Sequence, residues 1–392
     1  MKIKVSNACI VLIYILTFTS ALTYLRYTTT DIYTWRILYL VSVLGINVLC
    51  IIYKLHRRAI ILDRFTMLLG VIILLELCVS YFSGLFVVPM ILVDVMAWPM
   101  MLSVYYDYSK ENPMPGVFKK ITMIGMVLIC LFAIPALRLR LNGAGRAAVF
   151  STYYCIAFLP MIFMFFKNKV AVIFSGVVSV LMLLTFKRSA FIIVPTGLFL
   201  YYIVSISNQE NSKKKIRRAA LFAVGIVVFA FVGQYLIDKF NLNILQRLAS
   251  IMDDGGSGRN RIWAQVMDCF RNSSTIEKWL GHGFHSVFYE IRPLGIARYA
   301  HNSFLETLYD YGYIGLSLVI FVVLRIIIDT VKMVRNHDEY APLMAYSLVP
   351  MLVLGFVSYF FEQSVIILPL SLLWGICMGS FYGKSSQGRL YE

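Results

Sequence analysis

The chain has 392 residues, of which 60% are hydrophobic and only 14% are charged, and its mean hydropathy is +0.77. A soluble domain of this composition would leave too much apolar surface in water, so the composition excludes that class and predicts an all-α polytopic membrane protein. Membrane topology explains the formal net charge of +16, which therefore does not indicate binding to nucleic acid.

Apolar runs long enough to cross a bilayer as helices follow one another along most of the chain. With spans of roughly 17 to 25 residues, the sequence predicts about twelve transmembrane helices, near 8–25, 36–53, 65–83, 85–106, 120–137, 150–166, 170–186, 189–206, 219–236, 313–330, 342–360 and 365–382. The divisions within 65–106 and 342–382 are the least distinct. The prediction gives an N-terminal bundle of about nine helices (1–236), an external loop (237–303) and about three C-terminal helices (304–392).

The distribution of lysine and arginine predicts the orientation in the membrane, because cytoplasmic segments are enriched in both residues. An N-terminus in the cytoplasm makes every predicted inner segment basic and places the 237–303 loop outside. Both termini are then cytoplasmic, and the first span is retained because no A-x-A-like cleavage site follows it. The inner residues are Lys2, Lys4, Lys54, Arg57, Arg58, Arg64, Lys110, Lys119, Lys120, Lys167, Lys169, Lys213, Lys214, Lys215, Arg217, Arg218, Lys332, Arg335, Lys384 and Arg389.

A smaller set of basic residues falls on the outer side, against this bias. The planar guanidinium of arginine binds phosphate oxygens in pairs, so these residues are candidates to hold a lipid pyrophosphate on the outer leaflet. The alternative is that each side chain only reaches toward lipid head groups. The set is Arg138, Arg140 and Arg146 in one loop, Lys187 and Arg188 at a span end, and Arg259 and Arg261 in the 237–303 loop.

The 237–303 loop is the only long hydrophilic stretch, and its first motif is GRNRIW at 258–263. Ile262, Val266 and Phe270 recur every four residues and predict an amphipathic helix, with Arg259 in or just before its first turn. Backbone amides at a helix start, together with a guanidinium, bind anions. The alternative is a flexible linker before a surface helix with ordinary charges.

The second motif, WLGHGFH at 279–285, contains two glycines at the spacing of a tight turn. His282 and His285 are three residues apart and would form a metal site only if His301 joined them. Carboxylates and cysteines are not found at ligand spacing nearby, so we expect both histidines to be solvated or packed loop residues and predict no metal site.

The third motif begins at His301, directly before Ser303-Phe-Leu-Glu306. This S-x-x-E pattern has the form of a capping box and predicts a helix that starts at Ser303. A histidine at a helix N-terminus is held neutral by the helix dipole and accepts a proton readily. His301 is therefore a candidate general base, the alternative being a purely structural role.

Taken together, these motifs resemble the pattern of the O-antigen ligase and polymerase family, membrane glycosyltransferases of bacterial surface polysaccharides. The matching residues are Arg259 with Trp263, the Gly281 and Gly283 turn, and His301-Asn302 with Gly312 and Gly315 after it. Lys187-Arg188-Ser189 is similar to the family's basic residue at an external helix end, and the layout of spans around one large loop also agrees. The N-terminal spans carry no matching motif, and Arg138, Arg140 and Arg146 correspond by topology alone.

The resemblance implies a fold similar to GT-C glycosyltransferases and an inverting, metal-independent reaction without a cofactor. The donor would be a glycan on undecaprenyl pyrophosphate, and the acceptor a sugar hydroxyl of another lipid-linked glycan, on the outer face of a bacterial cytoplasmic (inner) membrane. His301 would take the acceptor proton and the external arginines would hold the pyrophosphate, with Asn302, Trp263 and Glu306 in support. Membrane lipids, and for a polymerase a chain-length regulator protein, would be the partners.

Three functions are compatible with the sequence. We favour a polymerase of O-antigen or capsule repeat units over a ligase that transfers polymer to lipid A core, because no additional domain for recognising the core is evident. A flippase or another transporter for lipid-linked glycans is the third, but transporters carry repeated halves and polar groups near mid-membrane. Here the polar residues gather in one loop.

Cysteine labelling in intact cells tests the predicted orientation. In a Cys269→Ser background, we expect a membrane-impermeant thiol reagent to modify Gly256→Cys but not Ser212→Cys, because 256 lies in the predicted outer loop and 212 beside a basic inner segment. Labelling at 212 without labelling at 256 would overturn both the orientation and the external position of the site.

Overall fold

The computed structural model describes residues 5–57, 63–84, 91–141, 148–166, 169–185, 187–209, 211–239, 258–291, 299–361 and 364–388. All regular structure in these ranges is helical, as predicted, and no strand occurs in them. The elements are α1 (Val5–Thr30), α2 (Tyr33–Arg57), α3 (Arg64–Phe82), η1 (Leu92–Met96), α5 (Ala97–Glu111), α6 (Val117–Leu141), α7 (Ala148–Phe165), α8 (Lys169–Thr185), α9 (Arg188–Ser207), α10 (Ser212–Lys239), α12 (Arg259–Asn272), α13 (Thr275–Leu280), η2 (Val287–Ile291), α14 (Ser303–Arg335), α15 (Ala341–Val357) and α16 (Ser364–Gly388).

The described part of each predicted span is almost entirely helical, because long apolar runs are the strongest signal in the sequence. Residues 85–90 of the predicted span 85–106 lie outside the described residues. In the described part of the chain, 7 helices are long and apolar enough to cross a membrane, namely α1, α2, α3, α6, α9, α14 and α16. Three further apolar helices, α7, α8 and α15, are shorter. A multi-pass membrane protein is therefore supported, but the count of about twelve spans is not confirmed.

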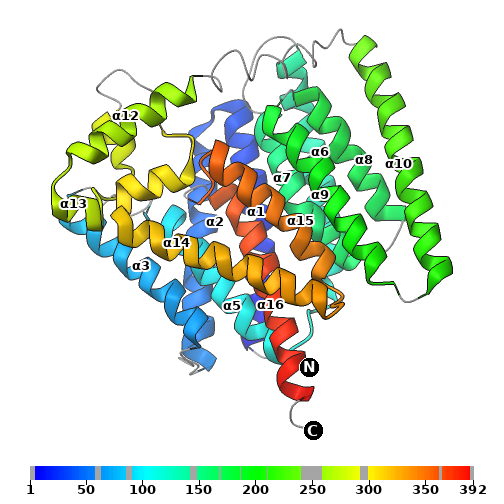
Figure 1. The fold of residues 1–392 in the computed structure, drawn as a ribbon, viewed down its shortest axis with the longest axis horizontal. Coiled ribbons are helices and arrows are strands. Elements are labelled where there is room, and N and C mark those ends of the chain that lie inside the picture. The colour runs from blue at the N-terminus through cyan, green and yellow to red at the C-terminus, as the bar shows by residue number, and fades with distance from the viewer. Residues whose placement is uncertain are drawn as a thin grey trace.

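The centre of the bundle is built on the close packing of α5 against α16 (Figure 1). Gly375, Gly379 and Gly383 lie four residues apart on α16, so they share one face. A Cβ atom at Gly379 would lie 2.3 Å from the Tyr106 carbonyl oxygen, and one at Gly383 would lie 2.2 Å from the Lys110 carbonyl oxygen. Small residues at these positions let the two backbones approach closely, as is common between helices in membranes.

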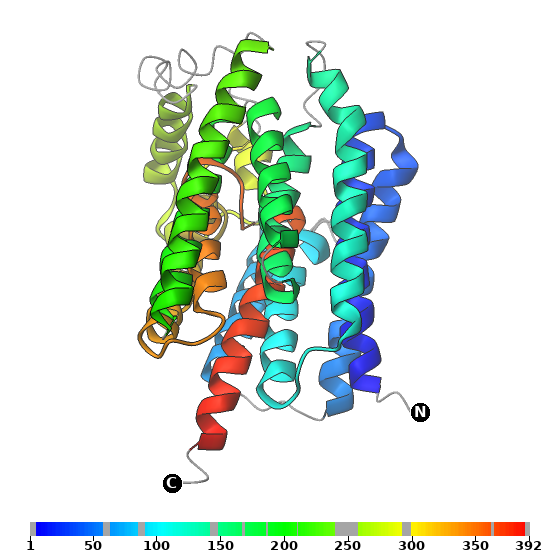
Figure 2. The same cartoon turned by 90° about the vertical axis from the view of Figure 1, so that its right-hand side faces the viewer.

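The first residues of α1 and the last of α16 lie at one end of the bundle, and α12 lies at the opposite end (Figures 1 and 2). Ion pairs connect ends of helices that carry the predicted inner lysines. Lys110 pairs with Asp63 at 2.8 Å, and Lys384 pairs with Glu339 at 2.7 Å. Which side of a membrane each end faces stays a prediction.

Helix α14 consists of two helical segments joined at Gly312, whose φ of 66° and ψ of −167° are not helical. Only the segment after the break coincides with the predicted span 313–330, and the segment from Ser303 to Tyr311 precedes it. A Cβ atom at Gly312 would lie 2.4 Å from the Trp279 carbonyl, so glycine is needed here both for the backbone conformation and for space. The break falls directly before the predicted span 313–330.

Helices α12 and α13 and the short η2 lie within the region predicted as an external loop. Helices α12 and η2 pack against the first segment of α14 through a small apolar cluster of their own, distinct from the core of the main bundle. Helix α13 also contacts α14. Gly255, Gly256 and Arg146 fall outside the described residues, as does the side chain of Arg140. The proposed boundaries 1–236, 237–303 and 304–392 therefore stay a prediction.

Candidate active site

His301 lies at the head of α14, one residue before the residue that caps the helix. The side chain of Asn302 accepts hydrogen bonds from the backbone N–H groups of Phe304 and Leu305, both at 3.1 Å. The helix thus begins at Ser303 as predicted, and its dipole acts on the segment that carries His301. His301 itself has a φ of 53°, a left-handed conformation that is uncommon for residues other than glycine.

The predicted capping box is wrong, although the start of the helix is right. Ser303 is the first helical residue, and its hydroxyl accepts from the backbone N–H of Phe361 at 3.3 Å and donates to the Ser358 carbonyl at 3.3 Å. The Glu306 carboxylate does not return to the cap residue. It binds the N–H of Ala300, two residues earlier, at 2.7 Å.

The Ala300 residue is held at both of its backbone polar groups. Its N–H donates to buried Glu306, and its carbonyl oxygen accepts a hydrogen bond from the Trp263 indole N–H at 2.9 Å. Ala300 itself is completely buried. The two bonds fix the peptide groups that lead into His301 and support the left-handed conformation that follows. Trp263 and Glu306, expected only as supporting residues, thus position the candidate base.

The predicted amphipathic helix is present as α12, and it begins at Arg259 as expected. Its stripe of Val266 and Phe270 packs into the apolar cluster with Leu305 and Leu308 of α14. Trp263 lies one turn after Arg259 on the same side of the helix. Anchoring Trp263 to the Ala300 carbonyl therefore brings the start of α12, with Arg259, toward His301.

Two cations act on the imidazole of His301. Burial lowers its pKa below the ordinary value of 6.5, and the positive charges of Arg259 and Lys187 lower it further. All three causes disfavour the charged ring, so His301 is a neutral proton acceptor near pH 7. The first helical turn of α12, the residue before α9 and the head of α14 thus meet around one histidine.

Lys187 also links this group to α7. Its ammonium lies 5.7 Å from the centre of the Tyr153 ring, and the Tyr153 hydroxyl is 2.8 Å from the hydroxyl of Ser189 on α9. Arg259 interacts electrostatically with Tyr153 as well as with His301. Lys187 belongs to the basic motif noted in the sequence, but only the three-dimensional arrangement shows that this lysine acts on His301.

The remaining basic candidates are placed differently. Arg188 is half-buried at the first residue of α9, adjacent to Lys187. Arg261 is exposed, and two residues along a helix rotate its direction by about 200° from that of Arg259. Arg138 is exposed near the end of α6, which continues beyond the predicted span. For Arg140 and Arg146 no side-chain position is described.

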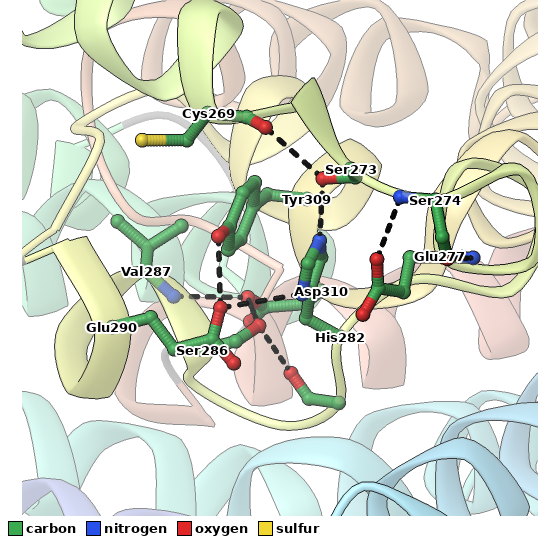
Figure 3. A network of polar contacts seen from close by, with 11 residues as sticks. Cys269, Ser273, Ser274, Glu277, His282, Ser286, Val287, Glu290, Tyr309 and Asp310 are labelled. Carbon is green, nitrogen blue, oxygen red and sulfur yellow. Dashed lines mark hydrogen bonds and ion pairs between the residues drawn. The ribbon is translucent and has the colours of Figure 1, made fainter. Parts of the chain in front are cut away.

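The other two loop histidines are packed, which was one of the two expectations for them. The His282 ring stacks on Tyr309 at 4.3 Å, and its Nε2 lies 2.8 Å from the Ser273 hydroxyl (Figure 3). His285 is buried, which lowers its pKa to about 3, and its Nε2 lies 2.6 Å from the Tyr359 hydroxyl. Among the described residues, no group of three His, Cys, Asp or Glu side chains is placed to hold a metal ion.

The G-x-G turn is fastened to the break in α14. The His282 N–H donates to the Tyr309 carbonyl at 3.1 Å, and the Gly283 N–H donates to the Asp310 carbonyl at 2.8 Å. The Asp310 carboxylate accepts from the Ser286 hydroxyl at 2.7 Å (Figure 3). It also accepts from the His285 N–H at 3.0 Å. Sequence reasoning missed Asp310, whose only signal is a second acid four residues after Glu306 on the same face of the helix.

Replacing Trp263 tests whether its hydrogen bond to the Ala300 carbonyl positions His301. Trp263→Phe keeps an aromatic side chain but removes the donor to the Ala300 carbonyl, a bond worth about 1 kcal/mol. We expect the segment around Ala300 and His301 to detach from α12 more often. Diethyl pyrocarbonate should then modify His301 about five times faster, as measured by mass spectrometry. Trp279→Phe, at an exposed tryptophan on α13, is the matched control and should leave the rate unchanged. An unchanged rate in Trp263→Phe would contradict the positioning role.

Comparison with known proteins supports the resemblance stated from the motifs. Residues 170–320 match the family model described as O-Antigen ligase. This region is less than half of the chain, but it contains Lys187, Arg259, the G-x-G turn and His301. The comparison with curated proteins finds no match.

Proposed function

We propose, from the match of residues 170–320 to the O-Antigen ligase family, that the chain is a polysaccharide polymerase. It would transfer a glycan from undecaprenyl pyrophosphate to a sugar hydroxyl of a second lipid-linked glycan. The observation that carries the proposal is the neutral His301 beside two cations, Arg259 and Lys187. This arrangement combines a proton acceptor with positive charge for a phosphate leaving group, the two needs of such a transfer.

In this mechanism, His301 accepts the proton of the acceptor hydroxyl as its oxygen bonds to the anomeric carbon of the donor. The bond between that carbon and the pyrophosphate oxygen breaks, and the leaving group carries away the electron pair. Attack from the side opposite the pyrophosphate inverts the configuration at the anomeric carbon. The imidazolium that forms is destabilised by Arg259 and Lys187, so it returns its proton readily to solvent or to the departing phosphate.

The pyrophosphate would be bound by the basic groups at the starts of α9 and α12. Arg259 and Arg188 supply planar guanidinium groups for bidentate contacts, and Lys187 adds a point charge. A further arginine from the 138–146 segment would complete the set. With this much positive charge available from side chains, the reaction needs neither a metal ion nor a cofactor.

Helix α12, which carries Arg259, lies at the bundle end opposite the start of α1 and the end of α16 (Figures 1 and 2). If those ends face the cytoplasm as predicted, the site faces the outer leaflet of a bacterial inner membrane, which suits a substrate anchored there. A ligase that transfers finished polymer to lipid A core is the second candidate, because the matching family model carries the description O-Antigen ligase. Both activities use the same leaving group and the same base. They differ in the acceptor.

His301→Ala tests the proposed base. We expect the transfer rate of purified protein to fall by about 10²- to 10⁴-fold, the usual contribution of general base catalysis. Donor binding should persist because Arg259 and Lys187 remain. His282→Ala should cost far less once the rates are normalised to folded protein, since His282 is assigned to the packing of the loop. A His301→Ala protein that polymerises at the wild-type rate would exclude the mechanism.

The same variant separates the two candidate activities when it replaces the wild-type copy in cells. Loss of a polymerase leaves single repeat units on the lipid A core, whereas loss of a ligase leaves polymer on its lipid carrier. We expect the first pattern when the surface glycans are separated by gel electrophoresis. Accumulation of lipid-linked polymer would assign the chain as a ligase.

Arg259→Lys tests the contact with the pyrophosphate. The variant keeps the positive charge but loses the planar fork, so we expect the transfer rate to fall by at least tenfold at normal protein abundance. Arg188→Ala should impair transfer as well. The matched control is Arg271→Ala, an exposed arginine near the end of the same helix that pairs with Asp268. Full activity of both Arg188→Ala and Arg259→Ala would rule out the phosphate contact.

A further inference from the structure

Three aromatic side chains that the proposed mechanism does not use form a cluster connected to the segment that carries His301. The ring centre of Tyr299 is 4.6 Å from that of Tyr359 and 5.7 Å from that of Phe288. All three side chains are partly exposed. They come from three separate segments, the one before His301, the one after α15 and η2, so only the fold brings them together. We call them the aromatic shelf.

Tyr359 is fixed in place from two directions. Its hydroxyl lies 2.6 Å from Nε2 of the buried His285, whose backbone N–H donates to the Asp310 carboxylate at 3.0 Å. On either side of Tyr359, Ser358 and Phe361 form hydrogen bonds with the Ser303 hydroxyl. A partly exposed ring held this firmly is prepared to receive a ligand, because little conformational entropy remains to be lost on binding.

The shelf is connected to the segment that carries the candidate base. Tyr299 precedes His301 by two residues, so their Cα atoms are at most about 7 Å apart. Tyr359 is tied through its neighbours to Ser303, two residues after His301. A general base must lie within hydrogen-bond reach of the hydroxyl that it deprotonates. A glycan whose hydroxyl reaches His301 would therefore extend to the shelf, either with that sugar or with the next one.

The chemistry of the shelf suits a sugar ring. A pyranose presents C–H groups on its faces and hydroxyl groups around its rim. Tyrosine combines an apolar ring face with a polar hydroxyl at its edge, and ligand sites are typically aromatic surfaces with a few fixed polar groups. The basic groups around Arg259 suit the donor pyrophosphate, whereas the shelf has no charge to offer a phosphate.

We propose that Tyr299 and Tyr359, with Phe288, form a subsite that stacks on a sugar ring of the acceptor glycan and holds its hydroxyl toward His301. The proposal rests on the function proposed above and adds to it where the acceptor binds. The shelf would then set the acceptor specificity, since the stacked sugar must present an apolar face together with a hydroxyl directed at the base.

Steady-state kinetics of the purified full-length protein in lipid nanodiscs tests the subsite. Tyr299→Leu and Tyr359→Leu should each raise the KM for the lipid-linked acceptor about tenfold, with the donor KM and the kcat changed less than about threefold. Tyr299→Phe keeps the ring and should stay close to wild type. Tyr313→Leu, at an exposed tyrosine on α14 beyond the break, is the matched control.

A binding measurement keeps the subsite testable apart from catalysis. The probe is the lipid-free repeat-unit oligosaccharide, released by mild acid from the cells' own lipid carriers, and saturation-transfer NMR reports its contact with the protein. We expect a signal with wild type and with His301→Ala, and its loss in Tyr299→Leu and Tyr359→Leu. Absence of any transfer by wild type would reject the proposed function, while the NMR signal would still decide whether the shelf binds a glycan.

Three results would overturn the subsite. One is an acceptor KM that does not change in either leucine variant. Another is an equal rise in the donor KM, which would assign the shelf to the donor. The third is unchanged oligosaccharide binding together with lower thermal stability in nanodiscs, which would show that the tyrosines anchor the protein at the membrane interface.

Discussion

Two hydrogen bonds to one buried residue hold the site together. Ala300 is bound at its N–H by Glu306 and at its carbonyl by Trp263. Side chains of α14 and α12 therefore both hold the residue directly before His301. Because both partners are on helices packed through the same apolar cluster, the candidate base is positioned by rigid elements although it lies in a connecting segment. The same anchoring of Trp263 brings Arg259 to the imidazole, and a single contact therefore places both the proton acceptor and one cation.

The break in α14 allows the elements outside the bundle to be attached to it. A continuous helix would offer no backbone groups to the G-x-G turn, since its carbonyl oxygens would be used within the helix. At Gly312 the helix is interrupted, and the Tyr309 and Asp310 carbonyls bind the turn while the Asp310 carboxylate binds the residues after it. The membrane-length part of α14 is thus joined to a short helix whose N-terminus carries the site. Gly281 in the turn and Gly312 in α14 allow the two backbones to approach closely.

Features set by local sequence could be predicted, and features set by long-range contacts could not. Apolar runs placed the helices, and four-residue spacing placed α12. The sequence pattern predicts Ser303 as the cap of α14, but asparagine and serine are both residue types that commonly cap helices. The choice of Asn302 depends on Ser303 binding a segment 55 to 58 residues later. Contacts such as His285 with Tyr359, 74 residues apart, leave no pattern in the sequence. The sequence shows the basic motif that contains Lys187, but it cannot predict the effect of Lys187 on His301, because that contact is also long-range.

The dependence of the transfer rate on pH in wild type and Arg259→Gln tests the central claim, a neutral His301 tuned by neighbouring cations, most directly. The base is active when deprotonated, so kcat/KM should fall on the acid side with an apparent pKa below 6.5, because burial, Arg259 and Lys187 all lower the pKa of His301. Removing the charge of Arg259 raises that pKa, so the acid limb should move to higher pH even if the maximal kcat/KM is lower. The control variant Arg271→Gln should leave the acid limb in place. An acid limb above pH 6.5 in wild type, or one that stays in place in Arg259→Gln, would contradict the account.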